Sequence, residues 1–421
     1  MTLRNSDKVR PNLTLDFRNS KKLDPRVTFT RASFAPASDP SSGSGVAGGQ
    51  YNMFNVNVPR LTDQGLLIEE SRTNLVPNSQ VFQTGWTIEH FTPTDNAVVA
   101  PDGTTTAASL FETTVNDFHA LYLAGVSQTD LCQSIFVKPA GRDNICVRFV
   151  ISSGDWYTIT FNLTGNGSIT QEVASTGSTW TIRAKDIRPL PNGWYRIGVA
   201  ATSGGSTSLM SVLGSDSPTP TLPPQWGFPR YTGDVTKGYY VWGAQVEANT
   251  FPTSYIPTNG AQVTRAADIC TIINDELTSW YNTPEGTISS DAMTPWDLKT
   301  SRYVWYFTNP GRKEHNASGS FQWFDGGAGT TNGETYVGGT TSKQAYSYSN
   351  VVPGRPCLNG DLKDQFLANT SPSAHTRLSL GSNFGTNLFF NGYIQRFAYY
   401  PTCIPDSALQ GATQRGDIRK L

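Results

Sequence analysis

The sequence predicts an all-β chain with two antiparallel β-sandwich or jelly-roll domains preceded by an extended N-terminal docking segment. Three observations favour this class. Only 15% of the 421 residues are charged, whereas an ordinary soluble domain has roughly 25%. The 39 Gly and 26 Pro residues provide many turn positions. The 10 Trp, 17 Tyr and 21 Phe residues suit pleated, half-buried strands.

Residues 1–74 are predicted to be an extended segment that docks on another protein. Residues 13–17 alternate apolar and polar side chains over a single short strand. A Ser- and Gly-rich stretch at 38–49 then has the composition of a flexible loop. Because no longer periodic pattern follows until the apolar run Leu66-Leu67-Ile68, this region is not expected to build a core of its own.

Residues 75–272 are predicted to form the first sandwich. Strict alternation from Tyr157 to Leu163 is typical of a half-buried antiparallel strand. The following Gly165-Asn166-Gly167 tolerates positive φ and predicts a tight turn into a partner strand. A further strand is expected over 239–246, with one face made by Tyr240, Trp242, Ala244 and Val246.

Residues 273–421 are predicted to form the second sandwich. Aromatic residues alternate with other residues over 303–307, and an Asn-Gly pair at 391–392 indicates a turn into a last strand. Only residues 405–414 have a helical pattern, and Asp406 is expected to cap that helix.

Charge, hydropathy and cysteine usage exclude several classes of protein. A formal net charge of −1 leaves no excess of positive charge to bind the phosphate backbone of nucleic acid. No run approaches the roughly 18 apolar residues of a membrane-spanning helix, so no membrane insertion is expected, and the N-terminus shows no secretory signal. The five cysteines include no Cys-x-x-Cys pair, which predicts reduced, mostly buried thiols.

No enzyme active site is predicted, and no cofactor is expected. Glu69 and Glu70 are adjacent in a predicted strand and therefore point to opposite faces, so an inter-segment salt bridge is favoured over paired acid–base catalysis. No nucleophile elbow or phosphate-binding loop is present. Calcium is the one cofactor alternative, held by loop carboxylates at Asp155, Asp291, Asp297 or Asp325.

Sugar binding has candidate residues in the loop-rich stretches. Aromatic rings can stack on the apolar C–H face of a pyranose, and a carboxylate can accept hydrogen bonds from its hydroxyls. The alternative is that these rings pack between layers or between chains. The candidate carbohydrate-binding residues are Trp226, Tyr231, Trp296, Trp323 and Asp325.

Three stretches carry a family resemblance. They are 27–33 with 59–60 and 65–75, then 192–196 with 238–247 and 252–268, and finally 391–401. Together they resemble bacteriophage virion proteins of the tail-fibre or structural-fibre type. The resemblance implies a carbohydrate-binding-module-like jelly roll, followed by a concanavalin-like (laminin-G-like) sandwich, and it brings no catalytic residues.

Residues inside these stretches make physical sense as scaffold. Large indole rings add apolar area to a core, arginines can donate two hydrogen bonds to carboxylates or carbonyls between layers, and Gly193 and Gly243 suit turn or bulge positions. The structural motif residues are Arg72, Trp194, Arg196, Trp242 and Arg265.

The resemblance and the composition together predict a non-enzymatic virion structural protein, exposed on the particle surface and assembled in the host cytoplasm. It is expected to contact other virion proteins through its N-terminal segment, to form a homo-oligomer (a trimer is favoured) and to attach to host-surface glycan. One alternative is a capsid-decoration or baseplate protein without a receptor role. A glycan depolymerase is the less favoured alternative, because no β-helix repeats are present.

Overall fold

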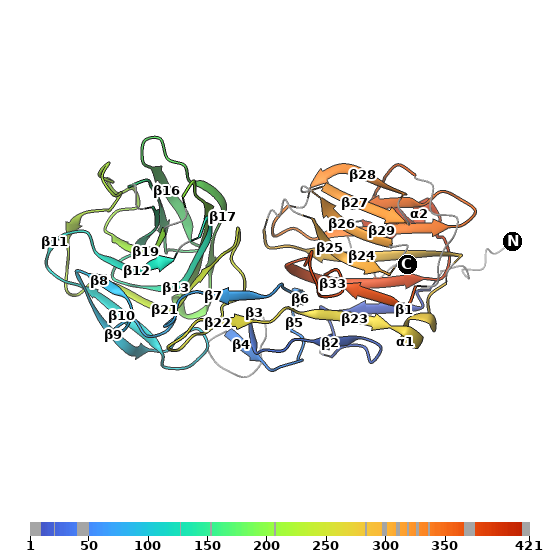
Figure 1. The fold of residues 1–421 in the computed structure, drawn as a ribbon, viewed down its shortest axis with the longest axis horizontal. Coiled ribbons are helices and arrows are strands. Elements are labelled where there is room, and N and C mark those ends of the chain that lie inside the picture. Colours follow the sequence, from blue (N-terminus) through green and yellow to red (C-terminus); the bar gives the residue numbers. More distant parts are fainter. Residues whose placement is uncertain are drawn as a thin grey trace. The chain divides into compact units, whose positions relative to one another are not determined.

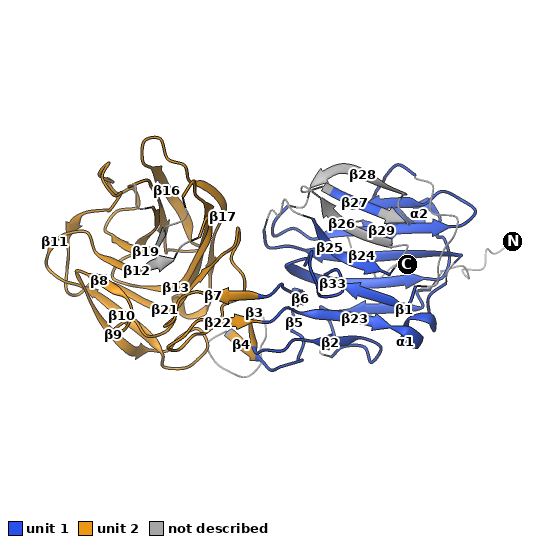
Figure 2. Cartoon of the chain, viewed as in Figure 1, with its two compact units in different colours: residues 1–34, 54–71, 266–421 blue, residues 35–53, 72–265 orange. Residues whose placement is uncertain are grey.

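The computed structural model of the chain is shown in Figure 1. It describes residues 10–20, 22–39, 50–126, 128–151, 154–205, 208–282, 284–296, 301–308, 312–317, 320–325, 328–335, 337–365 and 375–414. The chain divides into two compact units (Figure 2). Unit 1 takes Met1–Phe34, Phe54–Ser71 and Ala266–Leu421, and unit 2 takes Ala35–Met53 and Arg72–Arg265. The chain therefore crosses between the units four times.

The predicted separate N-terminal segment, 1–74, is instead divided between the two units. In unit 1, β1 (Leu13–Asp16) and β6 (Gly65–Ile68) both pair with β33 (Gly392–Tyr400), near the C-terminus. The apolar side chains of residues 13, 15 and 17 are buried in the core of that unit. These strands are not an arm awaiting a partner, because their backbone groups pair and their apolar faces are covered within this chain.

Unit 1 is a pair of facing antiparallel sheets. One sheet has the order β31-β30-β29-β24-β33-β6-β5, with β1 also on β33, and the other has the order β2-β23-β32-β25-β26-β27-β28. Their facing side chains form one hydrophobic core, which includes Ile288 and Tyr346 from the first sheet and Val304 and Leu378 from the second. The bounds of the remaining strands are β2 Thr28–Thr30, β5 Leu61–Thr62, β23 Ile269–Ile273, β24 Glu285–Met293, β25 Arg302–Phe307, β26 Arg312–Ala317, β27 Ser320–Asp325, β28 Ala328–Thr335, β29 Ser342–Ser349, β30 Arg355–Leu358, β31 Asp361–Leu362 and β32 Arg377–Leu380.

Two short α-helices also belong to unit 1. The first, α1 (Asn274–Thr278), was not predicted from the sequence. The predicted C-terminal helix is α2 (Asp406–Thr413), but the expected cap is wrong: Asp406 is the first helical residue, and the N-cap position is Pro405, which makes no side-chain capping bond. The carboxylate of Asp406 accepts instead from the Arg355 guanidinium at 3.0 Å, so an ion pair takes the group that was expected to cap the helix. No helix in the described part of the chain is long and apolar enough to cross a membrane.

Unit 2 is a second pair of antiparallel sheets, each of six strands. Their orders are β17-β18-β13-β21-β10-β9, called the groove sheet below, and β16-β15-β14-β19-β12-β8, called the strap sheet. A single core fills the space between them. The bounds are β8 Thr87–Glu89, β9 Phe91–Val98, β10 Ala107–Glu112, β12 Ala120–Val126, β13 Asp130–Ala140, β14 Asn144–Val150, β15 Trp156–Asn162, β16 Ser168–Ala174, β17 Thr181–Pro189, β18 Tyr195–Thr202, β19 Ser208–Ser215 and β21 Gly238–Glu247.

Short elements complete unit 2. Three two-stranded pairs are β3 (Ala35–Asp39) with β4 (Gln50–Phe54), β7 (Arg72–Asn74) with β22 (Val263–Arg265), and β11 (Asn116–Asp117) with β20 (Tyr231–Thr232). A 3₁₀ turn, η1, spans Pro191–Gly193. The predicted hairpin is confirmed: β15 and β16 pair, and Gly165 and Gly167 in the turn between them both have positive φ.

The predicted single face of β21 is interrupted by a bulge. The pairing register with β13 shifts between Ser134 and Phe136, and Gly243 on β21 has a φ of 62°. Beyond the bulge Ala244 and Val246 enter the core between the sheets, whereas Trp242 packs in a separate cluster on the other face of the groove sheet. The extra residue at Gly243 turns Ala244 and Val246 into the core, while Trp242 stays on the outer face with Tyr240, as a β-bulge allows.

Candidate functional site

A groove lies on the outer face of the groove sheet in unit 2. Its volume is about 320 Å³, and Trp242, which precedes the bulge, faces it from β21. The side chains that line it come from four separate stretches of the sequence. They are Pro36, Tyr51, Asn52, Met53, Gln80, Asp102, Thr104, Trp242, Tyr255 and Pro257.

Three nearly buried aromatic rings lie beneath the floor of the groove and form its base, with Tyr51 7%, Tyr255 2% and Trp242 1% exposed. The Trp242 and Tyr255 rings lie 4.8 Å apart, centroid to centroid, and Tyr51 approaches Trp242 edge-on at 6.3 Å. Phe136 packs beneath them, 4.8 Å from the Tyr51 ring. The indole N–H of Trp242 donates to the Thr106 hydroxyl at 3.0 Å. Because the rings pack against one another and the indole donor is satisfied, the aromatic base is held in place before any ligand arrives.

Polar groups border the aromatic base. The Asp102 carboxylate accepts hydrogen bonds from the backbone N–H and the hydroxyl of Thr104, at 2.9 and 2.7 Å, through one of its oxygens. The Tyr255 hydroxyl shares a 2.7 Å hydrogen bond with Ser79, and burial raises the pKa of Tyr255, so the phenol stays protonated near neutral pH. Asn52 and Gln80 add planar amides to the lining. The border thus offers a carboxylate acceptor and amide donors and acceptors next to an apolar base.

The groove depends on residues that are far apart in the sequence. The β3–β4 hairpin, which lies between two segments of unit 1, contributes Tyr51. The turn after β9 contributes Asp102, and the bulge in β21 contributes Trp242. Of these lining residues only Trp242 was singled out from the sequence, and it was predicted as scaffold. Gly243 was the available signal for the groove, because a strand glycine often marks a bulge.

The five predicted carbohydrate-binding residues do not come together. Trp323 is fully buried in the core of unit 1, and Trp296 is 9% exposed, so neither ring presents a face to a sugar. Asp325 ends β27, on the same strand as Trp323. In unit 2, Trp226 is 47% exposed on a loop, whereas Tyr231 is buried. Aromatic residues in polar stretches predicted exposure, but the buried rings fill the cores, which is their commoner use.

Tyr231 belongs to a buried polar cluster inside unit 2. Its hydroxyl donates to Glu112 at 2.7 Å, and Arg142 donates two 2.8 Å hydrogen bonds to the same carboxylate. Burial opposes ionisation of Glu112, but the hydrogen bonds from Arg142, the backbone of Asp234 and Tyr231 hold its pKa below the ordinary value. The His119 ring stacks on Tyr231 at 4.6 Å. Tyr231 is therefore a structural residue of a charged cluster.

We expect His119 to make the stability of unit 2 depend on pH. Its ring is fully buried, and burial lowers its pKa, although the nearby Glu112 carboxylate acts in the opposite direction and His90 and Arg142 add to the lowering. The unfolded chain therefore binds a proton at about pH 6.5, before the folded chain does. The free energy of unfolding should fall as the pH drops below about 6.5 and stop falling, for this group, once the pH is below the folded-state pKa.

Denaturant unfolding of the wild type and His119→Phe at pH 7.5, 6.5 and 5.5 measures this contribution. The wild type should lose more stability than the variant between pH 6.5 and 5.5. Equal slopes for the two proteins would contradict the assignment.

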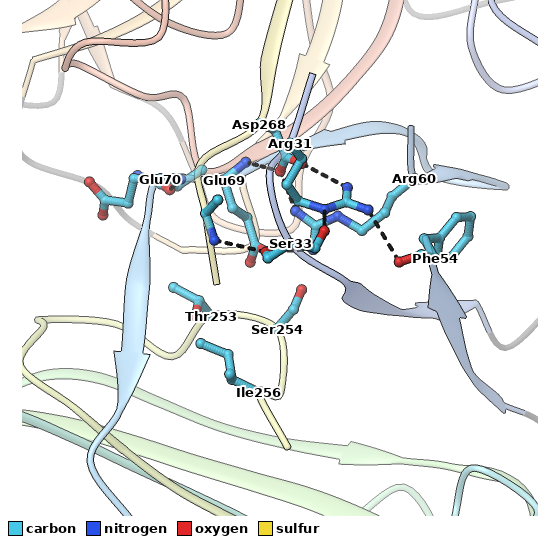
Figure 3. Close-up of polar contacts among 12 residues, drawn as sticks. Arg31, Ser33, Phe54, Arg60, Glu69, Glu70, Thr253, Ser254, Ile256 and Asp268 are labelled. Carbon is cyan, nitrogen blue, oxygen red and sulfur yellow. Dashed lines mark hydrogen bonds and ion pairs between the residues drawn. The ribbon is translucent and has the colours of Figure 1, made fainter. Parts of the chain in front are cut away.

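A buried ion network in unit 1 explains several motif residues of the sequence (Figure 3). The Asp268 carboxylate accepts from Arg31 at 3.0 Å, from Arg60, and from the backbone N–H of Glu69 at 2.9 Å. Arg60 also donates to the Glu69 carboxylate at 2.6 Å, and all four side chains are nearly or fully buried. Burial alone would lower the pKa of Arg60, but the two carboxylates hold it above the ordinary value.

This network confirms the predicted salt bridge at Glu69-Glu70. Glu69 pairs with Arg60, and Glu70 lies 3.5 Å from Arg302 on β25. Four separate stretches of the resemblance, around residues 31, 60, 69 and 268, thus meet at one place in unit 1. Their shared motif is a structural one.

The remaining motif residues lie in the framework of unit 2. Trp194 packs with Trp242 in the cluster beneath the groove. Arg196 donates from one nitrogen to the Thr253 carbonyl at 2.6 Å and to the Ser134 hydroxyl at 3.1 Å, so one of its acceptors is a carbonyl of the predicted kind. Arg72 donates to the Asn249 side chain at 3.0 Å, and Arg265 is buried where β22 pairs with β7.

The residues considered for metal binding are dispersed. Asp155 accepts hydrogen bonds from Ser175 and Thr179, Asp291 is partly buried in β24 with a pKa raised by burial, and Asp297 lies outside the described residues. Among the described residues, no three His, Cys, Asp or Glu side chains are grouped as metal ligands. All five cysteines are free and four are buried, which confirms the predicted thiols.

No protein-family model matches the chain, and no curated protein matches it. Similar solved structures include the CBM40 domain of the Ruminococcus gnavus IT-sialidase, which is 13% identical with a TM-score of 0.29, over 33% of this chain and 88% of that one. The SAP-like pentraxin from Limulus polyphemus is 9% identical with a TM-score of 0.26, over 32% and 73% of the two chains. Domains LG4-5 of the mouse laminin alpha1 chain are 10% identical with a TM-score of 0.21, over 78% and 90%. Structural similarity this distant carries no argument about ligand or origin.

Proposed function

We propose that unit 2 binds a neutral saccharide in the groove over Trp242 and Tyr255. The observation that carries the proposal is the pairing of an aromatic base with a planar polar border in one cavity. A cavity of about 320 Å³ lies at the lower end of the range for small-molecule sites, about 300–1,000 Å³. It therefore suits one or two sugar units.

The chemistry of a pyranose fits both parts of the groove. Its C–H face is apolar and would pack against Met53, which is 52% exposed, and against the exposed edge of Tyr51, above the buried rings of Trp242 and Tyr255. Its hydroxyls both donate and accept, so they would pair with the Asp102 carboxylate and the Gln80 amide. Two hydrogen bonds from Thr104 hold one oxygen of Asp102 in position. The carboxylate is therefore oriented before a sugar hydroxyl binds to it.

We propose that the groove binds without cleaving its ligand. Glycoside hydrolysis generally uses two carboxyl groups, which flank the scissile bond. Asp102 is the only carboxylate among the described residues that line the groove. One carboxylate can orient a sugar, but it cannot also supply the second acid–base or nucleophilic group.

The resemblance of the sequence to phage virion fibre proteins supports a setting for this binding. We propose that the protein is a surface appendage of the particle that attaches to host glycan. Several copies, with a trimer as the favoured assembly, would raise the overall affinity about 10²–10⁴-fold above that of one weak site. The competing proposal is a capsid-decoration or baseplate protein without a receptor role. We propose that residues 10–74 contact other virion proteins from within the two units, since their described strands pair there.

A glycan array probed with the full chain tests the binding proposal. We expect one or more neutral oligosaccharides to bind, and Tyr51→Ala and Asp102→Asn each to weaken that binding by about tenfold or more, since a hydrogen bond to a charged group contributes about 1.5–3 kcal/mol. The matched control is Asp216→Asn, an exposed carboxylate of unit 2 outside the groove, which should bind as the wild type does. Binding that survives both groove variants would contradict the proposal.

A further inference from the structure

Arg148 is a buried cation on the face of the strap sheet that points away from the core of unit 2. On β14 its neighbours Val147 and Phe149 enter that core, so Arg148 lies on the opposite face. It is 2% exposed. The register places it between Thr158 on β15 and Ser211 on β19.

No carboxylate balances this charge within the described part of the chain. The Arg148 guanidinium donates one hydrogen bond, to the backbone carbonyl of Trp226, and lies 3.9 Å from the centre of the Phe228 ring. Its Nε is buried without a hydrogen-bond partner, and so is the Ser211 hydroxyl directly across the strand pair. Burial lowers the pKa of Arg148 to about 9, since the protonated form loses its hydration. An anion placed between these two groups would satisfy both.

The segment that covers Arg148 is a short loop, 223–228, which we call the strap. Side chains of β15 hold it: the Trp156 indole donates to the Pro224 carbonyl at 2.9 Å, and the Thr158 hydroxyl donates to the Gly227 carbonyl at 3.1 Å. Trp226 adopts a φ of 73°, in the left-handed region that is strained for a residue other than glycine. The closed strap therefore holds a strained residue directly above an uncompensated cation.

Trp226 also contributes the most exposed tryptophan ring of the described residues, at 47%. Its carbonyl contacts Arg148 while its ring faces solvent. A ligand that has an anionic group next to an apolar face could contact both side chains. Its anionic group would pair with the Arg148 guanidinium, and its apolar face would stack on the Trp226 indole.

We propose that Arg148 and Ser211 form an anion-binding site beneath the strap, and that its ligand is a saccharide bearing a carboxylate, which stacks on Trp226. The carboxylate replaces the Trp226 carbonyl as the acceptor from Arg148 and takes the hydrogen bond of Ser211, so the strap lifts and the strain at Trp226 is released. The site is separate from the groove and does not rest on sugar binding there.

Calorimetric titration of the full chain tests the proposal with two probes that differ in one group. The probes are a trisaccharide containing glucuronate and the same trisaccharide with that carboxyl reduced to an alcohol. We expect the acidic probe to bind at least tenfold more tightly. Arg148→Met, which removes a buried charge and keeps an apolar stem, should lose that preference, and Trp226→Ala should weaken the acidic probe several-fold. The matched control is Arg183→Met on β17, a variant at an exposed site that should bind the acidic probe as the wild type does.

The outcomes separate this site from others. Thermal unfolding first establishes that each variant is folded. If Arg148→Met is not folded, Trp226→Ala carries the test, because Trp226 is 47% exposed and its removal leaves the core of unit 2 intact. Equal binding of the two probes, or unchanged binding by Trp226→Ala and folded Arg148→Met, would overturn the proposal. Acidic-probe binding that is lost in Tyr51→Ala instead would place the ligand in the groove, overturning this inference and supporting the proposed function. A sulfated trisaccharide bound in preference to glucuronate would overturn the choice of carboxylate.

Discussion

Replacing Asp268 by alanine is expected to lower the free energy of unfolding of unit 1 by about 3–5 kcal/mol, because removing one partner of a buried ion network leaves buried charge uncompensated. Two arginines, Arg31 and Arg60, would lose the carboxylate they share, and the backbone N–H of Glu69 would lose its acceptor. Denaturant unfolding followed by the fluorescence of the buried tryptophans measures the change. Since three separate segments converge on this carboxylate, the loss should also reduce the yield of folded protein.

The matched control is Asp24→Ala, in the same unit. Asp24 pairs with Arg26 at 2.7 Å, but the two side chains are 22% and 34% exposed. Exposed pairs contribute about 0–1 kcal/mol, so this variant should unfold close to the wild type. If Asp268→Ala and Asp24→Ala cost the same, the buried network is not what joins these segments.

Replacing Gly243 by alanine is expected to destabilise unit 2 by about 2–4 kcal/mol, from a left-handed backbone conformation and an overpacked contact together. Gly243 has a φ of 62°, and an added Cβ would lie 2.8 Å from the ring of Phe136, which is fully buried. Because the added Cβ would also lie 3.3 Å from the Tyr255 ring at the base of the groove, the variant should also weaken saccharide binding. Thermal unfolding and calorimetric titration measure the two effects.

Gly260→Ala separates strain from packing. Gly260 also has a positive φ, of 83°, but nothing lies within 4 Å of the Cβ that alanine would add. It should therefore lose only the conformational part, about 1–2 kcal/mol, and keep its saccharide binding. A Gly243→Ala protein as stable as Gly260→Ala would show that the bulge is not tightly packed.

Local patterns predicted the elements whose structure is decided locally. Alternation over 157–163 and the glycines at 165 and 167 specified the β15–β16 hairpin, since turn chemistry and strand period both act over a few residues. Alternation over 240–246 predicted one shared face, but the bulge at Gly243 reverses every later position, so Ala244 and Val246 enter the core while Trp242 stays outside it.

Long-range pairing decided what the sequence could not show. Leu13 and Leu15 lie on a short strand, β1, whose partner, β33, lies near the other end of the chain. No local signal distinguishes such a strand from a docking arm. For the same reason Tyr51 was missed as a groove residue: it reaches unit 2 in a hairpin that leaves and rejoins unit 1. Trp323 shows the converse, a ring in a polar stretch that the fold buries.

Saccharide binding in the groove is the central claim, and a crystal structure of the full chain with an array-selected neutral oligosaccharide tests it most directly. The predicted result is one sugar ring over Trp242 and Tyr255, with hydroxyls hydrogen-bonded to Asp102 and Gln80. An oligosaccharide bound at any other surface, with the groove left empty, would contradict it.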